Sequence, residues 1–329
     1  MGEGYGAKPA GASPGPVVIV AGPTASGKSA LALALAEALG GVVINADSMQ
    51  VYRELSILTN RPDAAAEARA PHRLYGVISA VEACSVARWR DMAVAEIAAA
   101  RAAGRLPILA GGTGLYIRAL VEGLSPVPEI PSGIRAAARA RHGEIGGAAF
   151  HAELGDRDPE MAARLAPGDS QRLIRAFEVI EATGESLAAW QRRPPADDIS
   201  CGAYDGPVLT LVLAPPREVL YAACDARFIA MVERGAGDEV RALLDLGLDP
   251  ALPAMKALGV PELARHLAGE IALDEAIAAA QKATRHYTKR QLTWLRHQTA
   301  GAVVFEAGFS ADVAGRAIAE SRRFLLTVP

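Results

Sequence analysis

A glycine-rich segment between an apolar run and a helix-forming stretch constrains the fold of this chain more than any other feature. It follows Val17–Ala21 and consists of Gly22, Pro23, Thr24, Ala25, Ser26, Gly27, Lys28 and Ser29. The phosphate-binding pattern G-x-x-x-x-G-K-[ST] requires these neighbours, a strand before it and a helix after it. Backbone N–H groups of such a loop favour a diphosphate or triphosphate at the helix N-terminus. A plain glycine turn would not explain the Lys-Ser pair.

Composition limits the class of protein. The 329 residues are 51% hydrophobic, enough for one large domain with a substantial core and a smaller domain. No apolar stretch approaches the roughly 20 residues of a membrane span, so we expect no transmembrane helix. The Gly-, Ala- and Pro-rich segment 1–16 resembles no targeting signal, and we predict a disordered leader. Cys84, Cys201 and Cys224 are far apart, which favours a cytoplasmic protein without disulfides or a zinc site.

Short apolar runs alternate with helical patterns over the first 125 residues. The runs lie at 17–21, 42–45, 74–78 and 107–110, with a helical pattern at 86–103. This alternation predicts an α/β fold with parallel strands and crossover helices. Ligands bind beside the carboxyl ends of such strands. The loops that carry Lys28, Asp47 and Thr113 should therefore face one cleft.

The pattern changes near Pro126, where several prolines precede a helical region without strand-like runs. We predict a helical insertion domain at 126–205, which divides a core made of 17–125 and 206–329. Within the insertion, 171–182 is the most distinct helix. After it we expect a strand at 208–213, helices at 217–235, 239–246, 260–268 and 273–298, and a last strand at 303–305.

The distribution of charge says more about partners than the formal net charge of −3. The segment 281–297 contains no acidic residue and carries Lys282, Arg285, His286, Lys289, Arg290, Arg296 and His297. Two further basic clusters are Arg135, Arg139 and Arg141, and Arg172, Arg175, Arg192 and Arg193. Each cluster alone fits a solvated helix face equally well. Together they favour a basic groove for nucleic acid.

Two other strand-end loops carry groups suited to catalysis. Asp47 is a candidate general base or magnesium partner, although capping the next helix is the simpler role for an isolated Asp. Gln50 and Tyr52 add amide and aromatic groups suited to a base edge or to stacking. Thr113, in a glycine-rich turn, can donate a hydrogen bond to a phosphate or leaving-group oxygen, or only cap a helix.

Three helical segments carry weaker signals. Asp169-Ser170-Gln171-Arg172 suits base-edge and phosphate contacts, but a capped, solvated helix would look the same. Arg227 lies on an amphipathic helix and means little alone. The stretch 284–296 interleaves cations with Tyr287 and Trp294, which suits a nucleic-acid backbone, although aromatic residues at such positions are equally typical of a core.

Taken in order, six motifs resemble the tRNA dimethylallyltransferase family, also called tRNA isopentenylpyrophosphate transferases. They occupy 22–29, 47–52, 111–116, 169–172, 255–259 and 289–296, and the resemblance covers 17–296. The phosphate loop is generic, but the ordered set is specific. The resemblance implies a P-loop NTPase-like parallel sheet flanked by helices, with a helical insertion that contacts tRNA.

The resemblance also implies an activity. Members transfer a dimethylallyl group from dimethylallyl diphosphate to the exocyclic amine of the adenosine 3′ to the anticodon, in tRNAs for codons that begin with U. An aryl amine is a poor nucleophile, so such an enzyme must orient it, remove its proton and stabilise the departing diphosphate. The base must also leave its stack. The implied cofactor is Mg²⁺, the implied partner is the tRNA anticodon stem-loop, and we expect a cytoplasmic monomer without a membrane partner.

Roles for individual residues follow from the same resemblance. The loop at 22–29 would hold a diphosphate rather than ATP. Lys28 and Ser29 would bind it together with Mg²⁺, which Ser29 would ligate, and Arg227 would be a second diphosphate-binding residue. Thr113 would lie near the bridging oxygen, and Asp47 would take the proton. The implied tRNA contacts are Asp47, Ser48, Met49, Gln50, Tyr52, Thr113, Arg135, Asp169, Ser170, Gln171, Arg172, Leu173, Lys289 and Arg290.

Two departures and three alternatives accompany this interpretation. Val260 stands where many members have an aromatic residue, and no Cys/His pair of the eukaryotic zinc finger follows, which favours the bacterial form. An isopentenyltransferase acting on free adenine nucleotides would need no insertion at 126–205. A P-loop kinase would need base contacts and a lid that the sequence does not show. A non-enzymatic RNA-binding module would leave Lys28 and Ser29 beside Asp47 unexplained.

Overall fold

The structure is a computed structural model that describes residues 14–194, 203–298 and 301–328. Cys201 and most of the predicted leader lie outside these residues. The chain divides into two compact units. We call them the core unit, up to Val121 and from Tyr204 onward, and the insertion unit, Glu122–Ala203. Among the described residues, no helix combines the length and the apolar character that a membrane span needs.

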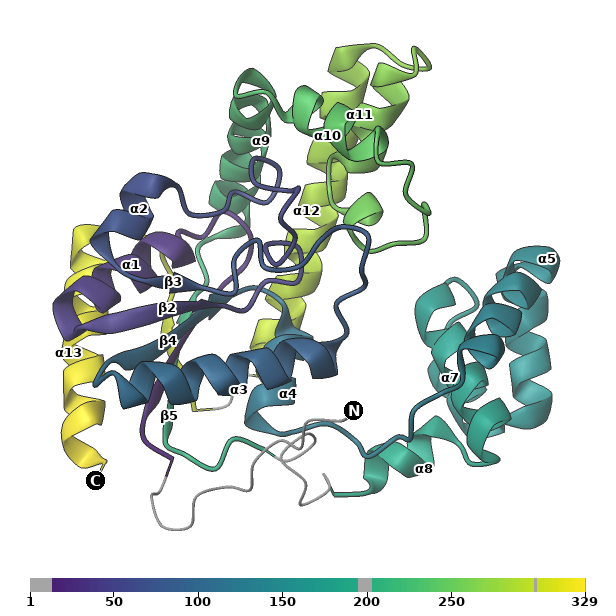
Figure 1. Ribbon diagram of the computed structural model, residues 1–329, viewed down its shortest axis with the longest axis horizontal. Coiled ribbons are helices and arrows are strands. Elements are labelled where there is room, and N and C mark those ends of the chain that lie inside the picture. Colours follow the sequence, from purple (N-terminus) through teal and green to yellow (C-terminus); the bar gives the residue numbers. More distant parts are fainter. Residues whose placement is uncertain (1–13, 195–202, 299–300, 329) are drawn as a thin grey trace, which may run out of the picture. The chain divides into compact units, whose positions relative to one another are not determined.

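A parallel sheet forms the centre of the core unit (Figure 1). In the part of the chain that the structure describes it has six strands, in the order β3-β2-β4-β1-β5-β6. Their bounds are β1 Val17–Ala21, β2 Gly41–Asn45, β3 His72–Arg73, β4 Leu106–Gly111, β5 Val208–Leu213 and β6 Val303–Phe305. All neighbours pair in parallel, which confirms the predicted fold class. The carboxyl ends of β1, β2 and β4 therefore open at one edge.

Helices cover both faces of this sheet (Figure 1). Their bounds are α1 Lys28–Leu39, α2 Ala64–Arg69, α3 Val86–Ala102, α4 Gly114–Val121, α9 Arg217–Glu233, α10 Ala236–Leu244, α11 Val260–Leu267, α12 Leu273–Gln298 and α13 Ala311–Thr327. Alternate residues of β1 point to opposite faces, so Ile19 packs with α3 and α4 while Val18 packs with α1 and α13. The first of these cores continues into α9, α10, α11 and α12.

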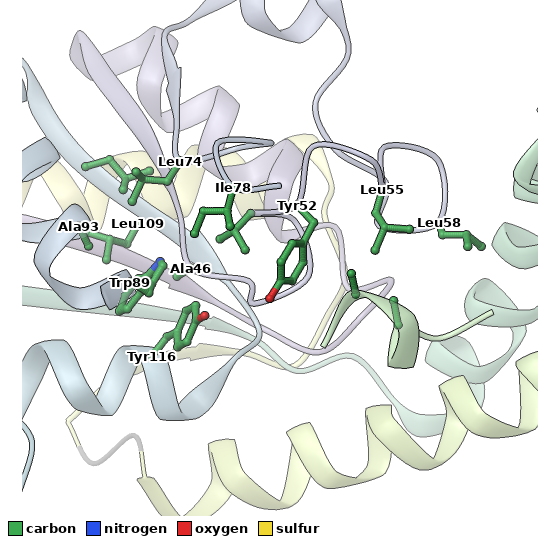
Figure 2. Packing of buried hydrophobic residues seen from close by; sticks show 14 of the residues in the cluster. Ala46, Tyr52, Leu55, Leu58, Leu74, Ile78, Trp89, Ala93, Leu109 and Tyr116 are labelled. Carbon is green, nitrogen blue, oxygen red and sulfur yellow. The ribbon is translucent and has the colours of Figure 1, made fainter. Parts of the chain in front are cut away.

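Trp89 of α3 anchors the core beneath the end of β2 (Figure 2). Its ring stacks on Tyr116 with centroids 4.2 Å apart. Its Nε1 donates a 2.9 Å hydrogen bond to the buried Asn45 carbonyl. Tyr52 lies in the same core, 1% exposed, and its hydroxyl accepts a hydrogen bond from Cys84 N. The loop after β2 therefore rests on packed aromatic rings.

The structure differs from the sequence predictions at several elements, among them α2, which was not predicted. The strand expected at 74–78 does not form, because Leu74 and Gly76 have φ values of 63° and 61°, which interrupt extended backbone. β3 is therefore confined to His72–Arg73. α10 begins at Ala236 rather than at 239. Helix α13 was not predicted, and its Ser310 N-cap accepts from Val313 N.

In the described residues of the insertion unit, every element of secondary structure is a helix. Its helices are α5 Ser132–Arg157, α6 Pro159–Arg164, α7 Ser170–Thr183 and α8 Leu187–Arg192. Gly146, with φ 76°, interrupts α5. A core of its own joins Phe150 of α5 to Leu173 and Phe177 of α7. Its apolar side chains are thus buried within the unit.

Replacing Trp89 by Phe tests the support beneath β2. Phe keeps the ring stack on Tyr116 but leaves the buried Asn45 carbonyl without its donor, so we expect the free energy of unfolding to fall by about 1–3 kcal/mol. Urea denaturation followed by circular dichroism measures the change. Trp190→Phe, which removes a 3.2 Å hydrogen bond from a half-buried indole, is the matched control and should cost less than about 1 kcal/mol. Equal stabilities of wild type and Trp89→Phe would contradict this role.

Candidate functional site

The loop between β1 and α1 has the backbone of an anion-binding turn. Gly27 has φ 87°, Ala25 has φ 65°, and no side chain caps the N-terminus of α1. The first-turn N–H groups are therefore left for a ligand. Lys28 Nζ donates to Pro23 O at 3.3 Å, so the ammonium lies back over its own loop. The loop can bind an anion with both backbone and side chain.

A cavity of about 260 Å³ lies beside this loop, within the core unit. Its wall contains one carboxylate, Asp47, and four cations, Lys28, Arg227, Lys256 and Arg290. This excess of positive charge favours a ligand with several negative charges. The full lining is Thr24, Lys28, Ser29, Asp47, Ser48, Met49, Gln50, Leu58, Thr59, Asn60, Arg227, Phe228, Lys256, Ala257, Leu258, Thr284, Tyr287 and Arg290.

Asn45 fixes the turn that carries Asp47. Its side chain is fully buried at the end of β2 and hydrogen-bonds both backbone groups of Asp47, accepting from N at 2.8 Å and donating to O at 3.0 Å. It also donates to Leu74 O at 3.0 Å. The Asp47 carboxylate accepts from Met49 N at 3.0 Å. A buried amide thus holds the carboxylate in the cavity wall.

Thr113 is placed behind this wall. Its Oγ1 accepts from Ser48 N at 2.9 Å and donates to Ser48 Oγ at 3.3 Å. A Cβ at Gly111 would overlap the Ala46 carbonyl, so only glycine allows these two loops to approach. The structure therefore brings Asp47 and Thr113 together, although Thr113 is not among the residues that line the cavity.

Removal from water changes the pKa of Lys28 and of Arg227. It lowers the pKa of Lys28 to about 8, with Asp47 opposing and Arg227 adding to the effect. It also lowers the pKa of Arg227, opposed by Cys224 and Asp47. In both cases the main cause is loss of water around the cation, and a neighbouring cation adds to it, Arg227 at Lys28 and Arg234 at Arg227. A bound anion would favour their charged forms.

Several cavity residues were not assigned from the sequence. They include Asn60, Phe228, Lys256 and Tyr287. Burial raises the pKa of Tyr287 and Asp47 adds to the effect, while Thr113 and Gln291 oppose it, so its phenol stays protonated. Lys256 lies in the 255–259 motif, and Tyr287 lies three residues before Arg290, so their spacing could have indicated them. Nothing local in the sequence marks Asn60 or Phe228.

Residues that the resemblance implies for tRNA contact fall into different places in the core unit. Ser48, Met49 and Gln50 line the cavity, and Gln50 Nε2 donates to the carbonyls of Thr59 and Asn60 at 2.9 and 3.2 Å. Tyr52 does not reach the cavity, because it is buried with its hydroxyl on Cys84 N. A ring contact with RNA would require it to leave this core. Lys289 and Arg290 are exposed on α12.

In the insertion unit, Ser170 and Gln171 begin α7, and Arg172 pairs with Asp169 at 3.0 Å. Leu173 is fully buried in the core of the unit, so its side chain is not available to RNA there. Arg135 on α5 has a buried Nε without a partner.

The basic clusters predicted in this unit are largely neutralised. The residues at 122–203 include thirteen acidic side chains and nine arginines. Ion pairs engage Arg141, Arg172, Arg175, Arg192 and Arg193. The partner carboxylates include Asp169 and Glu178, three residues from Arg172 and Arg175, and the more remote Glu160. The acid-free segment predicted at 281–297 lies on α12.

The donor set of the cavity fits a magnesium ion that arrives with its ligand. Among the described residues, no cluster of three or more His, Cys, Asp or Glu side chains could hold a metal. Ser29 and Asp47 offer one hydroxyl and one carboxylate at the cavity. Mg²⁺ commonly takes one or two protein ligands and fills its remaining positions with substrate phosphates and water.

Comparisons with known proteins agree on one family. The IPP transferase family model matches residues 50–298. The tRNA dimethylallyltransferase of Rhodospirillum centenum is 57% identical over 296 residues, covering 89% of this chain and 92% of that protein. The protein of the same name from Paramagnetospirillum magneticum is 56% identical over 314 residues, covering 95% and 98%.

Solved structures give the same result. The tRNA isopentenylpyrophosphate transferase of Bacillus halodurans aligns with a TM-score of 0.67 and 33% identity, covering 95% of this chain and 97% of that one. A eukaryotic dimethylallyltransferase acting on tRNA aligns with a TM-score of 0.78 and 25% identity, covering 96% and 80%. The family model and the relatives each match most of the chain, and it belongs to the IPP transferase family.

Proposed function

We propose that this protein transfers the dimethylallyl group of dimethylallyl diphosphate to the exocyclic amine of the adenosine 3′ to the anticodon, in tRNAs for codons that begin with U. The main support for this proposal is the cavity whose wall contains Asp47 together with Lys28 and Arg227. Relatives more than half identical are named tRNA dimethylallyltransferase, which supports the same acceptor and donor here.

The two ends of the donor suit two parts of the cavity. Lys28, Ser29 and Arg227 would bind the diphosphate, together with the N–H groups of the phosphate loop. Apolar groups from Met49, Leu58 and Phe228 line the same cavity and suit a branched hydrocarbon. In this role the phosphate loop would bind the leaving group of the reaction rather than a nucleotide.

The reaction is a substitution at the first carbon of the prenyl group. The lone pair of the adenosine amine forms the C–N bond, and the C–O bond breaks with its electron pair leaving on the diphosphate. The amine loses one proton, which Asp47 would accept. Lys28 and Arg227 would stabilise the charge that develops on the diphosphate. Thr113 would aid departure if its hydroxyl turned from Ser48 Oγ to the bridging oxygen.

We propose Mg²⁺ as the cofactor, with Ser29 as its protein ligand. When bound, it would neutralise part of the diphosphate charge.

The acceptor would be the tRNA anticodon stem-loop. The enzyme would act as a monomer in the cytoplasm. The segment Asp47–Gln50, with Ser48 and Met49 half-buried in the cavity wall, would contact the target base. Lys289 and Arg290 on α12, and Arg135 and Asp169–Arg172 in the insertion unit, would contact the rest of the loop. Extruding a loop base costs less than extruding one from a duplex.

A transfer assay with three acceptors tests the function. Purified protein is incubated with Mg²⁺ and labelled dimethylallyl diphosphate, in parallel with unmodified anticodon stem-loop RNA, with AMP, or with neither. We expect label in the stem-loop alone. Label in AMP would instead show a free-nucleotide enzyme. Label in neither acceptor would contradict the proposal and reopen the kinase alternative.

Removing the Asp47 carboxylate tests the proposed base. We expect Asp47→Ala to lower kcat by about two to four orders of magnitude with tRNA affinity nearly unchanged, because it removes proton acceptance rather than binding. Single-turnover rates and filter-binding affinities measure the two effects. Asp312→Ala, an exposed Asp on α13, is the control and should behave as wild type. An unchanged kcat in Asp47→Ala would exclude it from proton transfer.

The pH dependence of kcat/KM tests the lowered pKa of the Lys28 ammonium. Since the pKa of Lys28 is about 8, raising the pH through this value removes a positive charge from the empty cavity. A bound diphosphate favours the ammonium, so the charge persists to higher pH in the complex. We expect kcat/KM for dimethylallyl diphosphate to fall about tenfold per pH unit above about pH 8, while kcat stays level.

Lys28→Arg is the control for this profile, because a guanidinium stays charged throughout the range. Its kcat/KM should start lower and show no decline near pH 8. A decline at the same pH in the Arg variant would assign the profile to another group.

A further inference from the structure

Gln291 of α12 joins two loops that are remote from it in sequence. It is 5% exposed. Its Oε1 accepts a 2.8 Å hydrogen bond from Thr24 N in the phosphate loop, and its Nε2 donates at 2.9 Å to Gly112 O in the loop after β4. Both ends of one amide are thus used, one on each loop. Glutamine suits this position because it carries an acceptor and a donor side by side.

The fit around this amide is tight. A Cβ at Gly112 would overlap Gln291 Nε2 and lie 3.0 Å from Gly22 O. The glycine therefore allows the loop after β4 to approach both the amide and the phosphate loop. The other side of the Thr24 peptide is also held, because Cys224 Sγ donates to Thr24 O at 3.8 Å.

The contacts continue to Asp47. Gly112 precedes Thr113, whose Oγ1 accepts from Ser48 N, the residue after Asp47. A series of hydrogen bonds therefore runs from Thr24 through Gln291 to the loop after β4, and from Thr113 to the loop after β2. These hydrogen bonds connect the three loops that carry Lys28, Thr113 and Asp47.

We propose that Gln291 is a positioning residue that sets the separation between the diphosphate-binding loop and the Asp47–Thr113 loops. The proposal rests on the proposed function and adds to it a residue that lines no part of the cavity. Reaction between a bound donor and a bound acceptor depends on their alignment, and an error of about 1 Å can cost about 100-fold in rate. Loss of the bridge would leave both substrates bound but misaligned.

Two variants test the bridge, with a matched control on the same helix. Gln291→Met keeps the length of the side chain and removes both hydrogen bonds. Gln291→Glu keeps the acceptor for Thr24 N but can donate to Gly112 O only when protonated. The control is Gln281→Met, because Gln281 also lies on α12 and donates through its amide, at 3.1 Å, to Asp225 O on α9.

The readouts separate alignment from folding. We expect Gln291→Met to lower the single-turnover rate per active site by about 10–100-fold, with the KM for stem-loop RNA within about twofold of wild type. Active sites are counted by binding of dimethylallyl diphosphate. Hydrogen exchange should quicken in the peptide that contains Thr24. Gln281→Met should match wild type in all three measurements.

The Glu variant gives a test that general destabilisation would not pass. Its rate relative to wild type at the same pH should rise as the pH falls from 8 to 6, because protonation restores the donor to Gly112 O. The ratio cancels any titration that the two proteins share. A constant ratio would overturn the proposal, also in the case where Gln291→Met fails to fold.

The remaining outcomes are decisive as well. Equal rates per active site in Gln291→Met and Gln281→Met would overturn the positioning role and leave the proposed function standing. Absence of transfer to RNA by the wild-type protein would overturn the proposed function, and the positioning role with it.

Discussion

Two half-buried cations beside one carboxylate are the constraint on which this site depends. Lys28 and Arg227 lie in one small cavity, and burial lowers the pKa of each. Charges removed from water are costly unless an opposite charge compensates them. Asp47 supplies one negative charge, which leaves the cavity electropositive. A diphosphate would supply the remainder, so the charge of the cavity favours the ligand that we propose.

The sheet makes such an arrangement possible. Parallel strands end at one edge, so β1, β2 and β4 bring their loops together even though the loops are far apart in sequence. Buried amides then fix the loops. Asn45 shapes the turn at Asp47, and Gln291 joins the phosphate loop to the loop after β4. Trp89 and Tyr116 support the same edge from below (Figure 2). The site is thus held by hydrogen bonds between loops and by aromatic packing beneath them.

Much of this could be predicted from sequence, because the signals are local. The phosphate loop and the apolar runs indicated the parallel sheet, and their loops indicated that Lys28, Asp47 and Thr113 would meet. The failures concern features that depend on contacts. The positive φ of Leu74 prevents the strand expected at 74–78, and nothing in the leucine side chain indicates that conformation.

The sequence also did not show which side chains are buried or which charged side chains form ion pairs. An aromatic or aliphatic residue in a polar motif, such as Tyr52 or Leu173, can face the core or a ligand, and only packing decides which. Arg192 of the insertion unit forms an ion pair with Glu160, which is remote from it in sequence, whereas Arg172 pairs with the nearby Asp169. Gln291 was part of a recognisable motif, but its two partners lie on loops more than 170 residues distant.

The most direct measurement is a crystal structure of the protein with Mg²⁺ and an unreactive analogue of dimethylallyl diphosphate. We expect the diphosphate to lie within hydrogen-bonding distance of Lys28 and Arg227, with the first carbon of the prenyl group facing Asp47. A diphosphate bound elsewhere, or a prenyl group directed away from Asp47, would contradict this expectation.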